Sequence, residues 1–302
     1  MSQAGPERTW IQRWLDHLKY ERRLSALTGK NYHRDIEALY TFLCNAEVPD
    51  WAAVDPGHIR SFAARLHRRG LAPRSIQRRL AAVRNFYDYL VREGAARSNP
   101  GLDVTAPKAP KRLPETLDAD EMGRLLDIRT DHPLATRDRA IMELLYSSGL
   151  RLAELVGLKV IDVDLAEATV RVTGKGSKTR IVPVGRKARE ALVDWLKVRP
   201  QLVKSDEPAL FISRNGYKLS SRNVQARVQG WARQLGLPRD VSPHTFRHSM
   251  ATHLLESSGD LRAVQELLGH ADISTTQIYT HLDFQHLARI YDKSHPRARK
   301  RR

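Results

Sequence analysis

Near its C-terminal end the chain reads His244-Thr-Phe-Arg-His248, then Leu268-Gly-His270, and then Thr275-Thr-Gln-Ile-Tyr279. Two upstream stretches, Gly149-Leu-Arg151 and Gly174-Lys-Gly176, carry related side chains. Together the five stretches supply arginine, histidine, lysine and tyrosine, without a cluster of acidic metal ligands. Metal-free chemistry on a phosphodiester needs such groups, because it requires cations at the nonbridging oxygens, proton donors and a nucleophile. We therefore infer an enzyme that transfers DNA strands.

The arginines and histidines suit the charge and proton steps of that chemistry. Arg151 and Arg247 each offer a planar fork that stays protonated and holds phosphate oxygens in pairs. His244 is a candidate general acid or base, because an imidazole titrates near pH 6.5. His270 is a candidate hydrogen-bond donor to the phosphate. Either arginine alone would pass as a surface residue of a basic protein.

The lysine and the tyrosine supply the leaving-group proton and the nucleophile. Lys175 lies in a predicted turn between two strands, from which an ammonium group can reach a leaving oxygen; Lys178 is the nearby alternative. Tyr279 is the predicted nucleophile, and its phenol, with a pKa near 10, needs adjacent cations or a base. Taken singly, these residues read as a hairpin lysine and an amphipathic-helix tyrosine.

A zinc site is the competing interpretation of the histidines. His244, His248 and His253 fall on one predicted helix, at spacings of four and five residues. No cysteine or suitably spaced glutamate completes a recognisable zinc pattern. The chain also lacks a P-loop and a G-x-G-x-x-G motif after a strand. We therefore predict neither a metal nor a nucleotide cofactor.

Composition points to a nucleic-acid partner. The 302 residues are 41% hydrophobic, enough for a large core and two domains. Lys and Arg total 51 against 34 Asp and Glu, a formal charge of +17. A polyanion is the expected partner, because each phosphate that Lys or Arg neutralises releases condensed counterions. The inferred strand-transfer chemistry makes that polyanion double-stranded DNA. Charge alone leaves open a merely basic protein.

Nothing in the sequence indicates a membrane or an oxidising compartment. No apolar run approaches the ~20 residues of a membrane span, and the first residues lack a signal-peptide core. The single cysteine, Cys44, cannot form an internal disulfide and is expected to pack in a helical core. We expect a cytoplasmic protein.

Residues 1–98 are expected to form a small helical domain. Apolar residues recur at helical spacing from Trp10, and Asp55-Pro56 marks a helix start that Gly70 would end. A further helix is predicted from Pro73 to Glu93. Basic side chains near its start are candidate DNA contacts, although an ordinary solvated face is an equal alternative. They are Arg74, Arg78 and Arg79.

Residues 99–115 read as a linker, because prolines alternate with basic residues there. Pro107, Pro110 and Pro114 favour an extended spacer. Lys108 and Lys111 suggest that it runs along DNA. Two domains on such a tether could close around a duplex as a clamp.

Residues 116–302 predict a mixed but mostly helical domain. Asp118 is expected to cap a helix, and another is expected over 135–148, ending at Gly149. Strands are expected within 160–184. Further helices are expected near Arg186, Ser221, Pro243, Asp260 and Thr275. The helix near Ser221 carries possible base-reading or phosphate-binding residues, Arg222, Asn223, Gln225 and Arg227.

These residues, in this order, resemble the signature of the tyrosine recombinase (lambda-integrase-like) family. That signature is Arg, Lys, His-x-x-Arg, His, Tyr, and all six positions match: Arg151, Lys175, His244, Arg247, His270 and Tyr279. The resemblance covers essentially the whole chain. It implies a mostly α fold, with an N-terminal helical core-binding (SAM-like) domain and an α+β catalytic domain that holds a small β-sheet. It also implies cleavage through a 3′-phosphotyrosine.

Several C-terminal segments are similar to the bacterial Xer subfamily. Glu256-Ser-Ser-Gly-Asp260 and Leu282-Asp-Phe-Gln-His286 are nearer to its XerC branch than to its XerD branch. The resemblance implies resolution of chromosome and plasmid dimers by two subunits of each kind. A XerD-like partner and an FtsK-type translocase would then take part, and residues 284–291 would dock on a neighbouring subunit.

Three other functions stay open at this stage. A phage or mobile-element integrase would use the same chemistry at a different site. A type IB topoisomerase would share the active-site groups without joining two duplexes. A sequence-specific DNA-binding protein would need no nucleophile, so the complete six-residue set argues against it.

Overall fold

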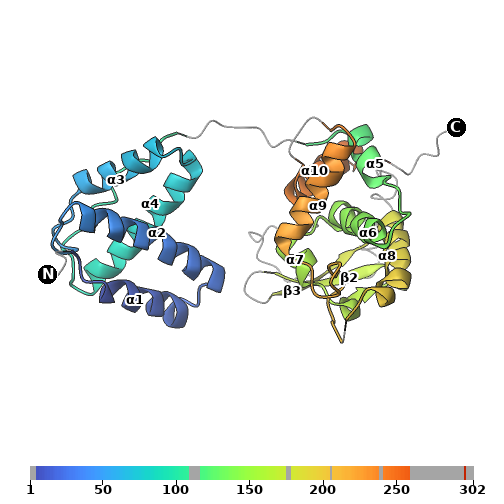
Figure 1. The fold of residues 1–302 in the computed structure, drawn as a ribbon, viewed down its shortest axis with the longest axis horizontal. Helices are drawn as coiled ribbons and strands as arrows, with labels where there is room; N and C mark the ends of the chain where they lie inside the picture. Colours follow the sequence, from blue (N-terminus) through green and yellow to red (C-terminus); the bar gives the residue numbers. More distant parts are fainter. Residues whose placement is uncertain are drawn as a thin grey trace. The chain divides into compact units, whose positions relative to one another are not determined.

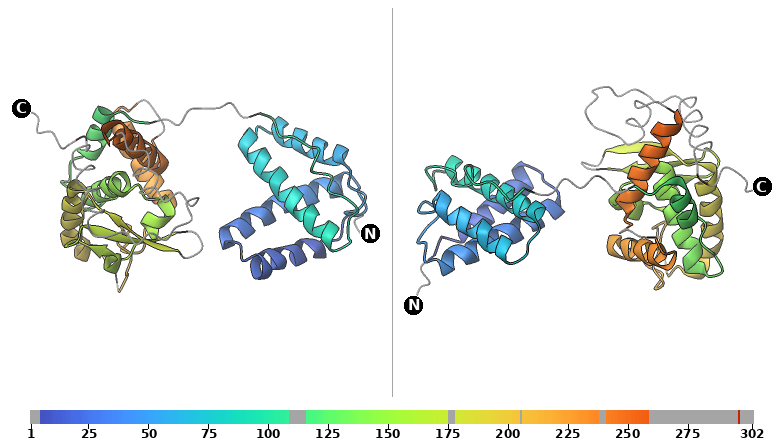
Figure 2. Two further views of the ribbon diagram at one scale, coloured as in Figure 1. Left: turned by 180° about the vertical axis from the view of Figure 1, so that it is seen from behind. Right: turned by 90° about the horizontal axis from the view of Figure 1, so that it is seen from above.

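The chain divides into two units, Met1–Lys111 and Arg112–Arg302. The computed structural model describes residues 5–108, 116–174, 178–204, 206–237, 241–258 and 296. The two units are drawn in Figures 1 and 2 and are best understood one at a time.

The N-terminal unit is helical, as predicted. Its elements are α1 (Thr9–Asp16), the short π-helix η1 (His17–Glu21), α2 (Ala26–Asn45), α3 (Pro56–Arg68) and α4 (Pro73–Arg92). The Asp55 side chain accepts the His58 N–H at the start of α3, and Pro56 occupies the first turn. Both α3 and α4 therefore begin at a proline whose fixed φ suits a first helical turn. The two helices predicted from these signals are confirmed.

Aromatic side chains fill the core of this unit. The Phe86 ring meets the edges or faces of Trp14 and Trp51, with ring centroids 5.2 and 4.9 Å away. Both buried indoles keep a hydrogen-bond partner: Trp14 donates to Asn85 and Trp51 to the carbonyl of Glu7. Buried aromatic pairs of this kind stabilise a core beyond their buried area alone. Cys44, expected in the core, is only half-buried on α2.

The C-terminal unit is built around α6 (Pro133–Ser148). Every residue of this helix from Ala135 to Ser148 except Arg139 is buried. It packs against α8 (Arg186–Val198) and α10 (Pro243–Ser258), which flank it in Figure 2. Gly149 ends it in the left-handed conformation, with φ of 54°, which glycine adopts at little cost. The predicted end of this helix is confirmed.

A small antiparallel sheet covers part of this core. It has the order β1 (Val163–Asp164), β2 (Thr169–Thr173) and β3 (Thr179–Pro183), and the short 3₁₀ helix η2 (Val160–Asp162) precedes it. Val172 and Val182 are buried, whereas Arg171 and Ile181 pair across the exposed face. This alternation follows the two-residue period of a strand and confirms the strands expected within 160–184.

The remaining elements complete the shell of the C-terminal unit. They are α5 (Ala119–Leu126), α7 (Leu152–Gly157), η4 (Arg199–Gln201) and α9 (Ser221–Gln234). Asp118 caps α5 as predicted, by accepting the Glu121 N–H at 2.8 Å. The helices expected near Asp260 and Thr275 lie outside the described residues. Of the helices that are described, none is long and apolar enough to cross a membrane.

Candidate active site

Arg151 lies in the short connection between α6 and α7, two residues after the left-handed Gly149. It is the residue before the first turn of α7, and 47% of its side chain is exposed. Its backbone N–H donates to Glu154 Oε2 at 2.8 Å, and its Nη1 donates to Glu154 Oε1 at 3.2 Å. The turn thus holds the guanidinium near the surface while a buried carboxylate orients it.

Glu154 is the acidic centre of the site. Only 3% of its side chain is exposed, and Arg180 on β3 donates to both of its oxygens, at 2.7 and 3.0 Å. Burial alone would raise the pKa of Glu154, but the hydrogen bonds from Arg180 and Arg151 outweigh burial and lower the pKa. The carboxylate is therefore ionised at neutral pH.

Arg247 brings α10 to the same place. The residue is 9% exposed, and its Nη1 donates to the carbonyl of Gly149, just before Arg151 in the chain. Burial and, next, the nearby charge of Arg151 lower the pKa of Arg247 to about 10. The group still carries its charge at neutral pH. Two arginines separated by 96 positions in the sequence are thus brought together, as the chemistry requires.

The three histidines of α10 differ in their exposure and contacts. His244, in the first turn, and His248 are both exposed. His253 is half-buried, and its Nδ1 lies 2.9 Å from the Tyr146 hydroxyl; burial lowers the pKa of its imidazole. Over the described part of the chain, no group of three or more His, Cys, Asp or Glu side chains is placed to hold a metal ion.

Three of the six predicted catalytic residues, Lys175, His270 and Tyr279, lie outside the described residues. Gly174, which precedes Lys175, can still be placed. A Cβ built on it would lie 3.5 Å from Glu154 Oε1 and 3.6 Å from Arg180 Nη1. The β2–β3 turn therefore starts in contact with the arginine–glutamate cluster.

Comparison with known proteins assigns the chain to a family. Residues 115–286 match the phage integrase family, and residues 11–94 match the phage integrase N-terminal SAM-like domain. A tyrosine recombinase XerC of Alcanivorax borkumensis is 54% identical over 97% of this chain and 95% of its own length. The XerC of Salmonella typhi is 51% identical over 96% of each chain. The chain is a tyrosine recombinase of the phage integrase family.

Solved structures of tyrosine recombinases share the fold of this recombinase. XerH bound to a palindromic difH substrate, in a post-cleavage complex, has a TM-score of 0.70 at 23% identity, covering 96% of this chain and 90% of its own. A lambda integrase dimer bound to a COC′ core site has a TM-score of 0.69 at 20% identity, covering 90% and 98%. A mostly helical enzyme with a SAM-like N-terminal domain and a small sheet in its catalytic domain is thereby established.

The candidate DNA contacts on α4 differ in their surroundings. Arg74 is exposed. Arg78 donates to Asp35 on α2, a carboxylate with no exposed surface, and Arg79 Nε lies 3.5 Å from its other oxygen. Burial lowers the pKa of Arg79. Arg78 and Arg79 therefore hold α2 to α4, and Arg74 is the freer candidate for a phosphate.

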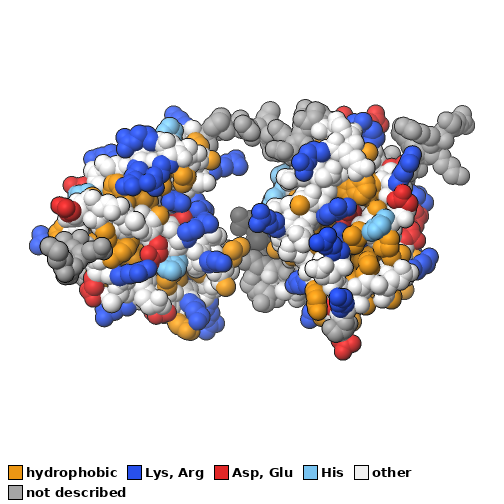
Figure 3. Space-filling view, viewed as in Figure 1, with side chains coloured by type: hydrophobic (Ala, Val, Ile, Leu, Met, Phe, Trp, Pro, Cys, Tyr) orange, Lys and Arg blue, Asp and Glu red, His pale blue; other side chains and the backbone are white. Residues whose placement is uncertain are grey.

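The remaining candidate DNA contacts divide in the same way. Lys108 and Arg222 are exposed, whereas Lys111 lies outside the described residues. Arg227 Nε donates to the buried Asp138 of α6 at 2.6 Å. Trp231 donates to the same oxygen at 2.9 Å. Lys and Arg side chains are spread over the visible face of both units (Figure 3).

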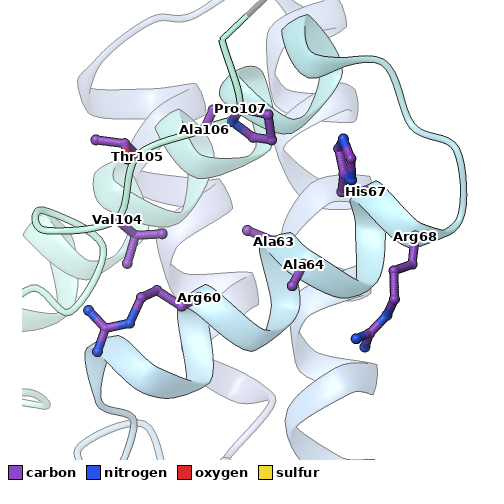
Figure 4. Close-up of a pocket in the computed structure, with 9 residues that line it drawn as sticks. All are labelled: Arg60, Ala63, Ala64, His67, Arg68, Val104, Thr105, Ala106 and Pro107. Carbon is purple, nitrogen blue, oxygen red and sulfur yellow. The ribbon is translucent and has the colours of Figure 1, made fainter.

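A groove of about 430 Å³ lies on the N-terminal unit, between α3 and the extended residues 104–107 (Figure 4). Small apolar side chains such as Ala63 and Ala64 form its floor, and Arg60 and Arg68 extend from its two ends. No local sequence pattern predicts this groove, because its two walls, residues 60–68 and 104–107, are separated along the chain.

Sequence reasoning also missed Glu154 and Arg180. Glu154 follows Arg151 by three residues, a spacing that places two side chains next to each other on a helix. This spacing is the one local pattern that predicts the contact between them. Arg180 follows the lysine turn by only a few residues but has no spacing relation to Glu154. Only the structure, which packs the sheet against α7 through β2, shows that they form a pair.

Proposed function

We propose that this recombinase cuts and rejoins double-stranded DNA through a covalent bond between Tyr279 and a 3′-phosphate. The observation that supports this proposal most directly is the net positive charge of the site. Arg151, Arg180 and Arg247 supply three guanidiniums around one buried carboxylate, Glu154. A scissile phosphate would bring the negative charge that this cluster lacks, and Arg151 and Arg247 are the cations that we expect to face it and to stabilise the transition state.

The six signature residues then divide the reaction among them. Tyr279 attacks the phosphorus and releases a 5′-hydroxyl, while Arg151, Arg247 and His270 stabilise the developing charge. Lys175 protonates the leaving oxygen, and His244 assists proton transfer.

Rejoining reverses these steps with a different strand. The 5′-hydroxyl of the partner strand attacks the phosphotyrosine and restores the tyrosine. Each transesterification conserves one phosphodiester, so the reaction consumes no ATP. It also needs no metal, because guanidiniums neutralise the phosphate.

The biological role that we propose is resolution of chromosome and plasmid dimers during cell division, in the cytoplasm. The near full-length likeness to XerC recombinases supports it. A XerD-like recombinase would complete a tetramer with two subunits of each kind on two duplexes. An FtsK-type translocase would control when the tetramer becomes active.

The two units would share the DNA between them. Residues 1–98 would form the core-binding clamp, residues 99–115 the basic linker and residues 116–302 the catalytic domain. We expect four side chains to contact the phosphate backbone of the DNA: Arg74, Lys108, Lys111 and Arg222. Arg78, Arg79 and Arg227 would contribute less, because buried carboxylates already hold them.

A covalent-trapping experiment tests the chemistry. The protein is incubated in EDTA with a duplex that carries a candidate recombination site and a nick near the cleavage position, so that the released fragment diffuses away. A denaturing gel should show a protein–DNA adduct, and peptide mass spectrometry should locate it on Tyr279. Tyr279→Phe should bind the duplex and give no adduct.

Two outcomes would contradict this function. An adduct formed by Tyr279→Phe would show that another nucleophile does the chemistry. Absence of any adduct, both alone and with a XerD-like recombinase added, would indicate a binding protein without cleavage activity. An adduct that appears only with the added recombinase would support the proposed partnership.

A further inference from the structure

Arg180 is outside the six-residue signature, yet both of its terminal nitrogens bind Glu154. Its two terminal nitrogens each meet one oxygen of Glu154, at 2.7 and 3.0 Å, in the parallel geometry that favours an arginine–carboxylate pair. Among the described residues its Nε has no hydrogen-bond partner. The polar contacts of this side chain therefore run to Glu154.

Arg151 makes a weaker contact with the same carboxylate. Its guanidinium reaches Glu154 through Nη1 alone, at 3.2 Å, and 47% of its side chain is exposed. The two Glu154 oxygens also accept the Arg151 backbone N–H and both bonds from Arg180. Little accepting capacity is left for a second, parallel contact with Arg151.

We propose that Arg180 is a positioning residue that keeps Glu154 from neutralising Arg151. With Arg180 in place, Glu154 orients Arg151 through one weak contact, and most of the guanidinium stays available for a phosphate. Without Arg180, Glu154 is free to rotate into a parallel, two-bond pair with Arg151. This inference rests on the phosphate-binding role proposed for Arg151.

The base of the β2–β3 turn adjoins this pair. A Cβ on Gly174 would be in ordinary contact with both Glu154 Oε1 and Arg180 Nη1, at 3.5 and 3.6 Å. The Gly174 N–H donates to the Lys178 carbonyl at 2.8 Å, which closes the base of the turn. The Arg180–Glu154 pair thus lies against Gly174, the residue that precedes Lys175 in the sequence.

The test is a suppressor experiment on the full-length protein. Single-turnover cleavage of the nicked duplex is measured for Arg180→Ala, Glu154→Gln and the double variant. Arg180→Ala should cleave about 10²-fold more slowly, the size of effect that misplacement of a catalytic group produces. Adding Glu154→Gln to Arg180→Ala should restore part of the rate, because a neutral amide cannot neutralise Arg151.

Arg171→Ala is the matched control. Arg171 lies on the adjacent strand β2, its side chain is 55% exposed, and it pairs with Asp162 at 3.0 Å. Arg171→Ala therefore removes one charge and one ion pair, as Arg180→Ala does. Its cleavage rate and that of the parent should agree. Arg180→Lys, which keeps the charge but not the fork, should fall between Arg180→Ala and the parent, and it serves also if Arg180→Ala unfolds.

Each result decides between the competing roles. Normal cleavage by Arg180→Ala, or a double variant as slow as Arg180→Ala, would overturn the positioning role. The second result would mean that Arg180 acts on the phosphate itself or only on the fold. Arg151→Ala is measured alongside: normal cleavage by that variant would instead remove the proposed function of Arg151 on which the inference rests.

Discussion

Asp35 in the N-terminal unit and Glu154 in the catalytic unit are both buried carboxylates held by arginines, but they are built differently. Asp35 meets two successive residues of one helix, Arg78 and Arg79 of α4. Glu154 meets Arg151 from its own turn and Arg180 from a strand, and Arg247 lies close by on a third element. The first arrangement ties two helices together, whereas the second gathers cations from three places.

The bonding of the two carboxylates differs in the same sense. Asp35 Oδ1 has no hydrogen-bond partner among the described residues. Both oxygens of Glu154 accept two bonds each. A carboxylate whose oxygens all accept hydrogen bonds holds its arginines in fixed positions. A site that stabilises a transition state needs such fixed positions, whereas a contact between two helices does not.

The largest expected effect is on the rate of DNA cleavage, which should depend on the cluster around Glu154 and not on the one around Asp35. Arg247→Ala should slow cleavage by about 3 kcal/mol in activation free energy, about 10²-fold, while DNA affinity changes little. The reason is that the lost cation acts mainly on charge that develops in the transition state. Single-turnover cleavage and equilibrium binding on the same duplex measure the two effects. A cleavage rate near that of the parent would mean that the cation cluster is structural, like the one at Asp35.

The second prediction concerns stability of the N-terminal unit. Asp35→Asn should lower its free energy of unfolding by about 2 kcal/mol, less than for a fully buried pair because Arg78 is 37% exposed. Amide hydrogen exchange in the full-length protein should quicken in α2 and α4. Exchange in α6 of the catalytic unit should stay as in the parent. Equal acceleration in both units would show that the two clusters are not energetically separate.

The third prediction follows the pKa of Glu154. Because its folded pKa lies below the ordinary value of 4.5, its charge stabilises the fold above about pH 4.5, and this contribution is lost as pH falls through the folded pKa. One such group changes stability by at most about 1.4 kcal/mol per pH unit. Urea unfolding between pH 3 and 7 should show a smaller acid-side loss in Glu154→Gln than in the parent. Identical slopes would mean that Glu154 is not held as a carboxylate.

The smallest effect is expected at the surface of the sheet. Arg171→Ala removes an exposed pair with Asp162 and should change the free energy of unfolding by less than about 1 kcal/mol. Urea denaturation of the full-length protein measures this. A larger loss would show that ion pairs on this sheet are stronger than their exposure suggests, and the comparison of the two buried clusters would need that correction.

Helix boundaries could be predicted because their signals are local. Asp55 and Pro56 start α3 through contacts within one turn, and Gly149 ends α6 because its left-handed backbone suits glycine. The π-helix after α1 carries no such signal, so the sequence does not predict it.

Partnerships across the chain could not be predicted, because periodicity gives no information about distant contacts. Arg78 reaches Asp35 over 43 positions, and Arg227 reaches Asp138 over 89. From its local surroundings alone, each arginine is predicted to contact DNA. The structure adds a buried partner that the sequence pattern does not reveal.

The candidate site was predictable in part for the same reason. Arg151 and Arg247 stand out through the order of the signature residues, and the structure brings them together. Arg180 lacks a place in that order, so its pairing with Glu154 becomes visible only when the sheet is placed beside α7. Lys175, His270 and Tyr279 stay predictions.

The pairing of Arg227 with Asp138 has a consequence for engineering new target specificity. Asp138 is 2% exposed, and Arg137 and Arg227 are its two cationic partners, so replacing Arg227 would remove half of the positive charge that compensates this buried carboxylate. A mutant library on α9 should therefore keep Arg227 constant. Diversity belongs at Arg222, Asn223 and Gln225, which are exposed and can be exchanged at little expense to the fold.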